Sequence, residues 1–192
     1  VMLTISLISF ILAVPLFAHK ITATVFTRIV AIVLFYSAIL TWNSLYYLPL
    51  SQGGVGLYSG LFHVSTTTLA FQILVCVVGA ILLAGWGPTT YNLKLGNSKV
   101  GIERSVSVNT NFVHVNTINE YSMIVLFSVL GSVLLISSYN FLSMYMGIEL
   151  QSFAAYILCS LYRNSQSATF AGLKYFLLGS LASGIIVLGT AI

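Results

Sequence analysis

Glu149 is an acidic residue in the middle of a long apolar run, "FLSMYMGIELQSFAAYILCSLYR", which extends from Phe141 to Arg163. A carboxylate in the hydrocarbon of a membrane costs about 2.5–3.5 kcal/mol on insertion scales, so its presence needs a reason. On an α-helix, the residues four before and three, seven and eleven after it share its face, and all carry hydroxyl groups that can donate to a carboxylate or hold water. We therefore predict a polar stripe that faces protein or internal water. Its other members are Tyr145, Ser152, Tyr156 and Ser160.

Lys174 is a second charge within an apolar segment. At about 1.5 Å per residue, it is expected roughly 10 Å below the membrane surface and Glu149 roughly 20 Å below it, on antiparallel neighbouring helices. Two charges about 10 Å apart at an effective dielectric near 20 interact by about 1.7 kcal/mol, enough to couple their proton affinities without locking an ion pair. The two residues are therefore predicted to relay protons. Two alternatives stay open: Lys174 extends to the lipid headgroups, or Glu149 is a structural, hydrogen-bonded carboxyl.

Other kinds of chemistry are not indicated by the sequence. Cys76 and Cys159 lie in separate apolar segments without a CxxC spacing, and His19, His63 and His114 lie in three different connections. Because no Ser/His/Asp set, carboxylate pair or phosphate-binding loop occurs, we predict no catalytic, cofactor-binding or metal site. The net charge of +4 arises from few acids and few bases, which does not indicate a surface for nucleic acid.

The composition predicts an integral membrane protein. Hydrophobic residues make up 58% of the chain and charged residues 5%, with a mean hydropathy of +1.03, whereas about a quarter of the residues in a soluble domain are charged. Backbone groups in lipid must bond internally, so apolar windows of spanning length should be helices. The fold class predicted is an all-α polytopic transmembrane bundle of about six helices, near Met2–Ala18, Ile29–Leu48, Thr67–Trp86, Tyr121–Tyr139, Phe141–Tyr162 and Ala168–Ile192.

These windows divide the chain into three parts. Residues 1–87 hold the first three helices with an outer hairpin loop at 49–66, residues 88–120 form a polar loop, and residues 121–192 hold helices four to six. The first window lacks a basic leader, so we expect a retained helix and not a signal peptide. Apart from Lys174, the basic residues all lie in the odd-numbered connections and none in the even-numbered ones, which places the odd-numbered connections inside and the N-terminus outside. They are Lys20, Arg28, Lys94, Lys99, Arg104 and Arg163.

Three stretches resemble a known family. "NFLSMYMGIELQSFAAYIL" (140–158) and "SATFAGLKYFLLGSLASGIIVLGTAI" (167–192) are similar to the fifth and sixth helices of the antiporter-like membrane subunits of respiratory complex I. "GLYSGLFHVSTTTLAFQIL" (56–74) resembles the segment that enters the third helix of these subunits. In that family the acid of the fifth helix, here Glu149, tunes a lysine on the central polar axis, and Lys174 matches the lysine of the sixth helix.

The resemblance implies a redox-inert subunit of the proton-translocating NADH:ubiquinone reductase, without catalysis or a cofactor in this chain. Its partners would be other membrane subunits of complex I and phospholipids, with cardiolipin as a candidate. It would lie in the mitochondrial inner membrane with its N-terminus on the intermembrane-space side; a bacterial plasma membrane is the alternative. These residues would open the first of two inverted repeats, with more sequence after Ile192. Two other functions stay open, a cation/proton antiporter subunit and a non-pumping membrane scaffold.

Overall fold

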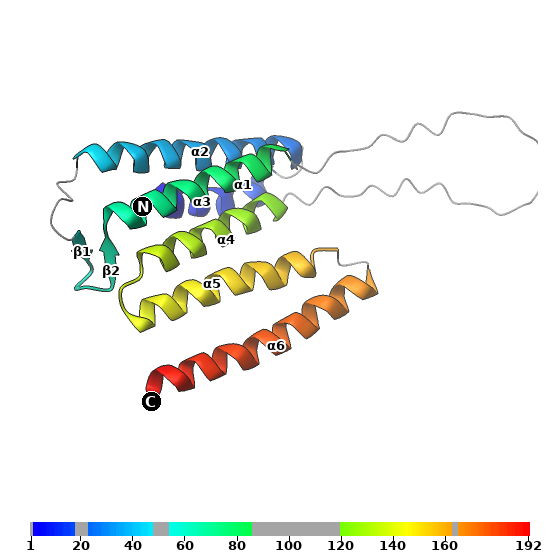
Figure 1. Ribbon diagram of the computed structural model, residues 1–192. Helices are drawn as coiled ribbons and strands as arrows, with labels where there is room; N and C mark the ends of the chain where they lie inside the picture. Colours follow the sequence, from blue (N-terminus) through cyan, green and yellow to red (C-terminus); the bar gives the residue numbers. More distant parts are fainter. Residues whose placement is uncertain (1, 18–22, 48–53, 86–119, 163–164) are drawn as a thin grey trace, which may run out of the picture.

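The computed structural model describes residues 2–17, 23–47, 54–85, 120–162 and 165–192. The described residues form six helices and one two-stranded hairpin (Figure 1). All six predicted apolar windows are therefore confirmed as helices. The elements are α1 (Met2–Phe17), α2 (Ala23–Tyr47), β1 (Val55–Leu57), β2 (Phe62–Val64), α3 (Thr66–Gly85), α4 (Glu120–Ser137), α5 (Phe141–Cys159) and α6 (Gln166–Ala191).

Five of these helices, α2 to α6, are long and apolar enough to cross a membrane. The first helix, α1, has 16 residues, which at 1.5 Å per residue spans about 24 Å against a hydrocarbon core of about 30 Å. We predicted six helices of spanning length, and among the described residues five have that length. A second correction concerns Arg28, which we placed in the first connection but which is exposed within α2.

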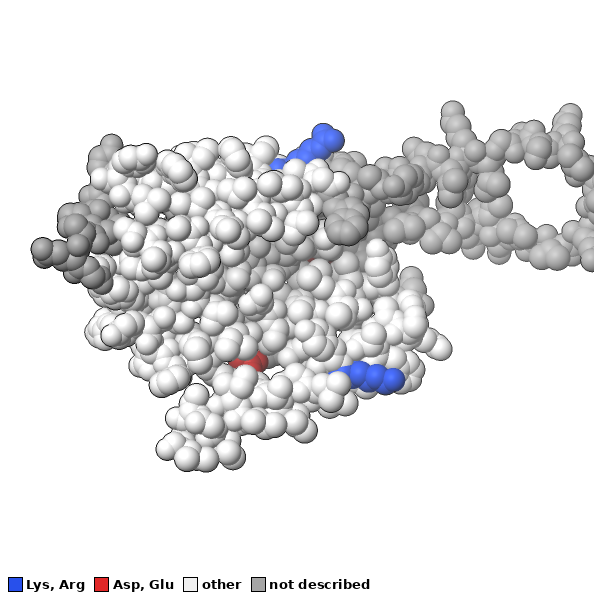
Figure 2. Space-filling model, in the orientation of Figure 1, with Lys and Arg blue, Asp and Glu red and all other residues white. Residues whose placement is uncertain are grey.

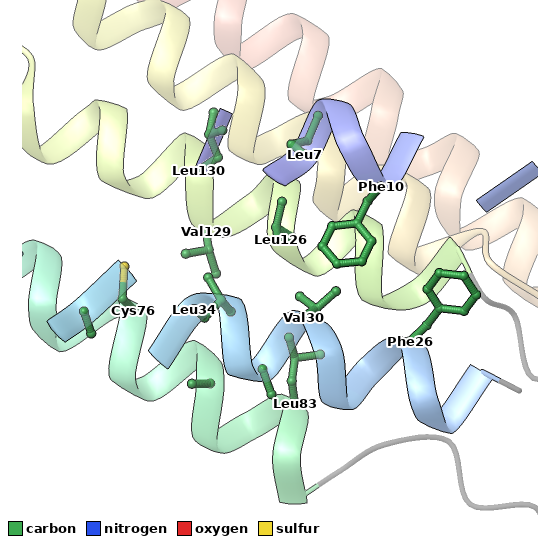
Figure 3. Close-up of a cluster of buried hydrophobic side chains, with 13 residues drawn as sticks. Leu7, Phe10, Phe26, Val30, Leu34, Cys76, Leu83, Leu126, Val129 and Leu130 are labelled. Carbon is green, nitrogen blue, oxygen red and sulfur yellow. The ribbon is translucent and has the colours of Figure 1, made fainter. Parts of the chain in front are cut away.

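The core lies among α1, α2, α3 and α4 (Figure 3). Leu34 of α2 and Leu126 of α4 are completely buried, and Val30 and Cys76 are 1% exposed. Cys76 is buried in this core as a small apolar residue, whereas Cys159 is exposed on α5. Close packing accounts for Gly79 as well, since a methyl group there would lie 3.1 Å from Val129.

Helices α4, α5 and α6 lie side by side in chain order (Figure 1). The backbones of α4 and α5 approach closely at two glycines, because a methyl on Gly131 would lie 2.9 Å from the backbone nitrogen of Gln151 and one on Gly147 would lie 3.0 Å from Cα of Leu135. On α6 the described buried residue is Gly172, and most of the helix surface is exposed. α5 is therefore held firmly against α4 and contacts α6 along a narrow stripe.

The second connection contains a β-hairpin, as predicted for the loop at 49–66. β1 pairs antiparallel with β2 in the register Val55↔Val64, Gly56↔His63 and Leu57↔Phe62. The residues of the turn take left-handed backbone conformations, with φ of 54° at Tyr58, 57° at Ser59 and 87° at Gly60. The hairpin packs against the turn between α4 and α5, where Phe62 bridges Ser138. The polar loop at 88–120 lies outside the described residues except for Glu120, the first residue of α4.

Candidate functional site

Glu149 lies in the middle of α5 and is half-buried. Gly147 and Ala154 are among the buried residues of this helix. Glu149 follows Gly147 by two residues, about 200° around the helix, so it lies on the other side, which it shares with Tyr156 and Ser160. The carboxylate oxygen Oε1 is buried and has no hydrogen-bond partner among the described residues. An unsatisfied buried acceptor costs about 1–3 kcal/mol and more when charged, so this oxygen is the most unusual polar atom of the described bundle.

The hydroxyl stripe predicted around Glu149 lies on a half-buried face of α5. Tyr145, Ser152, Tyr156 and Ser160 are all partly covered. The serine hydroxyls do not bind the carboxyl group: Ser152 donates to the backbone oxygen of Glu149 at 2.9 Å, and Ser160 donates to the backbone oxygen of Tyr156 at 3.1 Å. Bonds of this kind satisfy a hydroxyl within its own helix turn. The stripe therefore supplies hydroxyl groups near the carboxyl without a direct bond from either serine.

Two members of the stripe contact α6. The ring of Tyr156 makes edge-to-face contacts with Tyr175 at 4.9 Å and Phe176 at 5.7 Å, and its hydroxyl occupies the space where a methyl on Gly179 would lie. A methyl on Gly172 would lie 2.7 Å from Cβ of Ser160. Both residues line an open groove of about 320 Å³ between the two helices. The predicted stripe thus faces α6 at these two positions.

The register of these contacts places Glu149 opposite a part of α6 that the sequence alone did not single out. Because Ser160 lies at Gly172 and Tyr156 lies near Gly179 in antiparallel helices, Glu149 falls near the level of Ser183 at about 1.5 Å per residue. Ser183 is half-buried and donates to Ser180 of its own helix at 2.9 Å. The small residues Gly179, Ser180, Ser183 and Gly184 on α6 are the signal in the sequence for this close neighbour, since small residues allow helices to approach each other in membranes.

Lys174 is exposed on α6 and is not brought to Glu149. It follows the buried Gly172 by two residues, which is about 200° around the helix, so it lies on the side away from α5. In the register above it is level with Leu158, about 13 Å along the axis from Glu149. Figure 2 shows the basic surfaces of the described residues separated from the acidic surface by uncharged side chains. Lys174 therefore does not lie on the face of α6 that meets α5, whereas the separation of about 10 Å stays a prediction.

Known proteins resemble this chain in the region of the site. Residues 138–192, which include both charges, match the transmembrane family of NADH:quinone oxidoreductase/Mrp antiporter proteins. NADH-ubiquinone oxidoreductase chain 2 of Rhizopus oryzae is 43% identical over 100% of this chain and 36% of its own length. NADH-quinone oxidoreductase subunit N of Paramagnetospirillum magneticum is 49% identical over 38% of this chain and 15% of its own length.

These matches confirm the resemblance read from the motifs. The chain spans about a third of the length of that relative, 36%. The identity extends over all six helices, whereas the family match covers α5, α6 and the turn before them. The part of the chain that carries Glu149 and Lys174 is therefore similar to known proteins in both comparisons.

Proposed function

We propose that this chain, which is related to the antiporter-like membrane subunits of NADH:quinone oxidoreductases, is part of a proton-translocating subunit in the membrane arm of complex I. It would be redox-inert, hold no cofactor and perform no catalysis alone. Quinone reduction elsewhere in the complex would be coupled to proton movement through Glu149, Lys174 and water. The observation that carries the proposal is the buried, unpartnered oxygen of Glu149 on a helix within the matched region.

The chemistry follows from the surroundings of the carboxyl group. A fixed salt bridge or a full set of hydrogen bonds would hold one protonation state, whereas Oε1 of Glu149 has no partner among the described residues. Within a membrane, taking up a proton removes the charge that is costly to bury, and releasing it restores that charge. A passing proton on water or a change in a neighbouring charge can therefore change the protonation of Glu149, as a relay requires.

Lys174 would act from the other side of α6. Its exposed position directs it away from α5, so a direct exchange of a proton with Glu149 is not supported by the geometry. We propose that Lys174 meets groups outside the described residues, with α6 between the two charges. Extension of its side chain to the lipid headgroups is the alternative.

The same proposal gives the surroundings of the protein. It would be a multi-pass protein of the mitochondrial inner membrane with its N-terminus on the intermembrane-space side, as the distribution of basic residues predicts. Its partners would be other membrane subunits of complex I and phospholipids, cardiolipin among the candidates. The names of the two relatives, a chain of NADH-ubiquinone oxidoreductase and a subunit of NADH-quinone oxidoreductase, support membership in such a complex.

A cation/proton antiporter is the second candidate function, because the matched family includes Mrp antiporter proteins. The two functions differ in what accompanies the protein. Copurification with flavin and iron–sulfur subunits supports a complex I subunit, and isolation without redox subunits supports the antiporter. A membrane scaffold that moves no protons is the third candidate function. The variant Glu149→Gln tests whether the protein moves protons and so separates the scaffold from the other two functions.

The test is Glu149→Gln in the full-length protein within its assembled complex. The amide keeps the size of the side chain but cannot lose a proton, so we expect a lower ratio of protons pumped to electrons transferred, with assembly retained. Glu120→Gln is the matched control, since it removes the other described acid, which is exposed at the start of α4. A normal ratio in the Glu149→Gln complex would show that the carboxyl is structural.

A further inference from the structure

The carbonyl oxygen of Leu61, at the tip of the hairpin, accepts hydrogen bonds from two donors near the start of α5. The backbone N–H of Tyr139 donates to it at 3.1 Å, and the hydroxyl of Ser143 donates to it at 2.8 Å. The ring of His63 also lies on the ring of Tyr139, with 5.4 Å between centroids. One backbone oxygen of the hairpin is thus bound both by the turn and by the first turn of the helix that carries Glu149.

Ser143 differs from the other serines around the site. Ser137, Ser152 and Ser160 donate to carbonyl oxygens of their own helices, whereas Ser143 also reaches a residue 82 positions earlier in the chain. Its side chain is 6% exposed. Its oxygen lies 2.8 Å from the backbone oxygen of Asn140 as well, so a single hydroxyl hydrogen is shared between a bond within the helix and a bond to the hairpin.

The conformation of the hairpin turn directs this carbonyl group. Tyr58 and Ser59 are non-glycine residues with φ of 54° and 57°, a region that L-residues seldom adopt and that persists where the surroundings hold it. The N–H of Leu61 donates back to the carbonyl of Tyr58 at 3.2 Å, which closes the turn. The outward direction of the Leu61 carbonyl is therefore set by the turn itself.

We infer that the β1–β2 hairpin positions α5, and that the hydrogen bond from Ser143 to Leu61 fixes the height of Glu149 along the bundle. Ser143 precedes Glu149 by six residues, about 9 Å along one continuous helix, so a shift at Ser143 is transmitted to the carboxyl. Ser143 is a positioning residue, and its effect on pumping rests on the proposed role of Glu149. The hairpin would thereby set which part of α6 the carboxyl faces.

The experiment uses the full-length protein in its assembled complex with the variant Ser143→Ala. Ser137→Ala is the matched control, because Ser137 is also buried, at 8% exposure, near the same turn but bonds within its own helix. Ser143→Thr keeps the hydroxyl and is the rescue variant. Spin labels at the exposed positions 55 and 146 report the distance between hairpin and α5 without altering the turn, and the infrared carbonyl band of Glu149 reports the surroundings of its carboxyl.

Ser143→Ala removes the bond to Leu61 and also the acceptor for the backbone N–H of Asn140, 3.2 Å away. We expect loss of the bond to Leu61 to shift the ratio of docked to undocked hairpin about two- to tenfold. The label distance should broaden, the Glu149 band should move and the proton-to-electron ratio should fall, while Ser137→Ala leaves all three unchanged and Ser143→Thr restores them. An unchanged distance and band in Ser143→Ala overturn the inference. If the distance and band change but neither Ser143→Ala nor Glu149→Gln alters pumping, the positioning holds and the proposed function fails.

Discussion

Gly147 is the residue at which the position of α5 against α4 can be tested most sharply. It is buried two residues before Glu149, and a methyl group there would lie 3.0 Å from both Cα and the backbone nitrogen of Leu135 and 3.1 Å from its Cβ. These neighbours belong to or adjoin a helix backbone and cannot rotate away. Gly147→Ala must therefore separate the two helices by a few tenths of an ångström.

The size of the effect follows from two opposing contributions. Forcing an extra methyl into a packed interface costs about 1–3 kcal/mol. Replacing glycine by alanine within a helix gains up to about 1 kcal/mol. Because three contacts are tight at once, we expect a net loss of about 1–2 kcal/mol in the free energy of unfolding. The same displacement would move Glu149 relative to α6.

Unfolding of the purified protein in mixed micelles with increasing SDS, followed by circular dichroism, measures this loss. Gly85→Ala is the control, because a methyl at Gly85 meets nothing within 4 Å. We expect Gly85→Ala to be neutral or slightly stabilising. If Gly147→Ala unfolds at the same SDS fraction as Gly85→Ala, the close contact between α4 and α5 does not exist as described.

Two further predictions concern the connections between helices. Gly54 has φ of 83°, and a methyl there would lie 2.5 Å from the carbonyl oxygen of Val64. Gly54→Ala should therefore destabilise the hairpin by at least about 1–2 kcal/mol in the same unfolding assay. Gly56→Ala, with open space around it, should be tolerated; equal stability of the two variants would contradict the hairpin geometry. Lys99, in the polar loop at 88–120, should react only with amine reagents that reach the inner side of sealed vesicles, and modification from outside would reverse the predicted orientation.

The helices could be predicted from the sequence because a bilayer imposes a simple rule, that an apolar run of sufficient length must be helical. The bounds of α3 and α5 therefore fall close to the predicted windows. The start of α2 could not be predicted, because hydropathy alone places the charged Arg28 before the helix. A long side chain on an exposed helix face can nevertheless keep its charge near the membrane surface, and Arg28 is exposed within α2.

The face of α6 that meets α5 could not be predicted from its polarity. Apolar side chains surround this helix, and Leu173, Leu177, Leu178 and Leu181 are all exposed around Lys174. Only the small residues Gly172 and Gly179 mark the contact with α5, and small residues are what allow close approach of helices in membranes. The spacing in the sequence predicts Lys174 near Glu149 because spacing alone does not reveal how α6 is rotated about its axis.

The bond between Ser143 and Leu61 had no signal in the sequence. The acceptor is a backbone carbonyl, which every residue carries, and its direction depends on the left-handed conformations of Tyr58 and Ser59. Neither tyrosine nor serine favours that conformation. A contact of this kind depends on how the hairpin packs against the α4–α5 turn, two segments that are far apart in the sequence.

The most direct test of a protonation change at Glu149 is an infrared difference spectrum of the assembled complex during turnover. A carboxyl group that gains or loses a proton shows a change in its carbonyl band, and Glu149→Gln identifies the band that belongs to this residue. We expect a band that changes with turnover in the unmodified complex and is absent from the variant. A spectrum in which no band depends on Glu149 would contradict it.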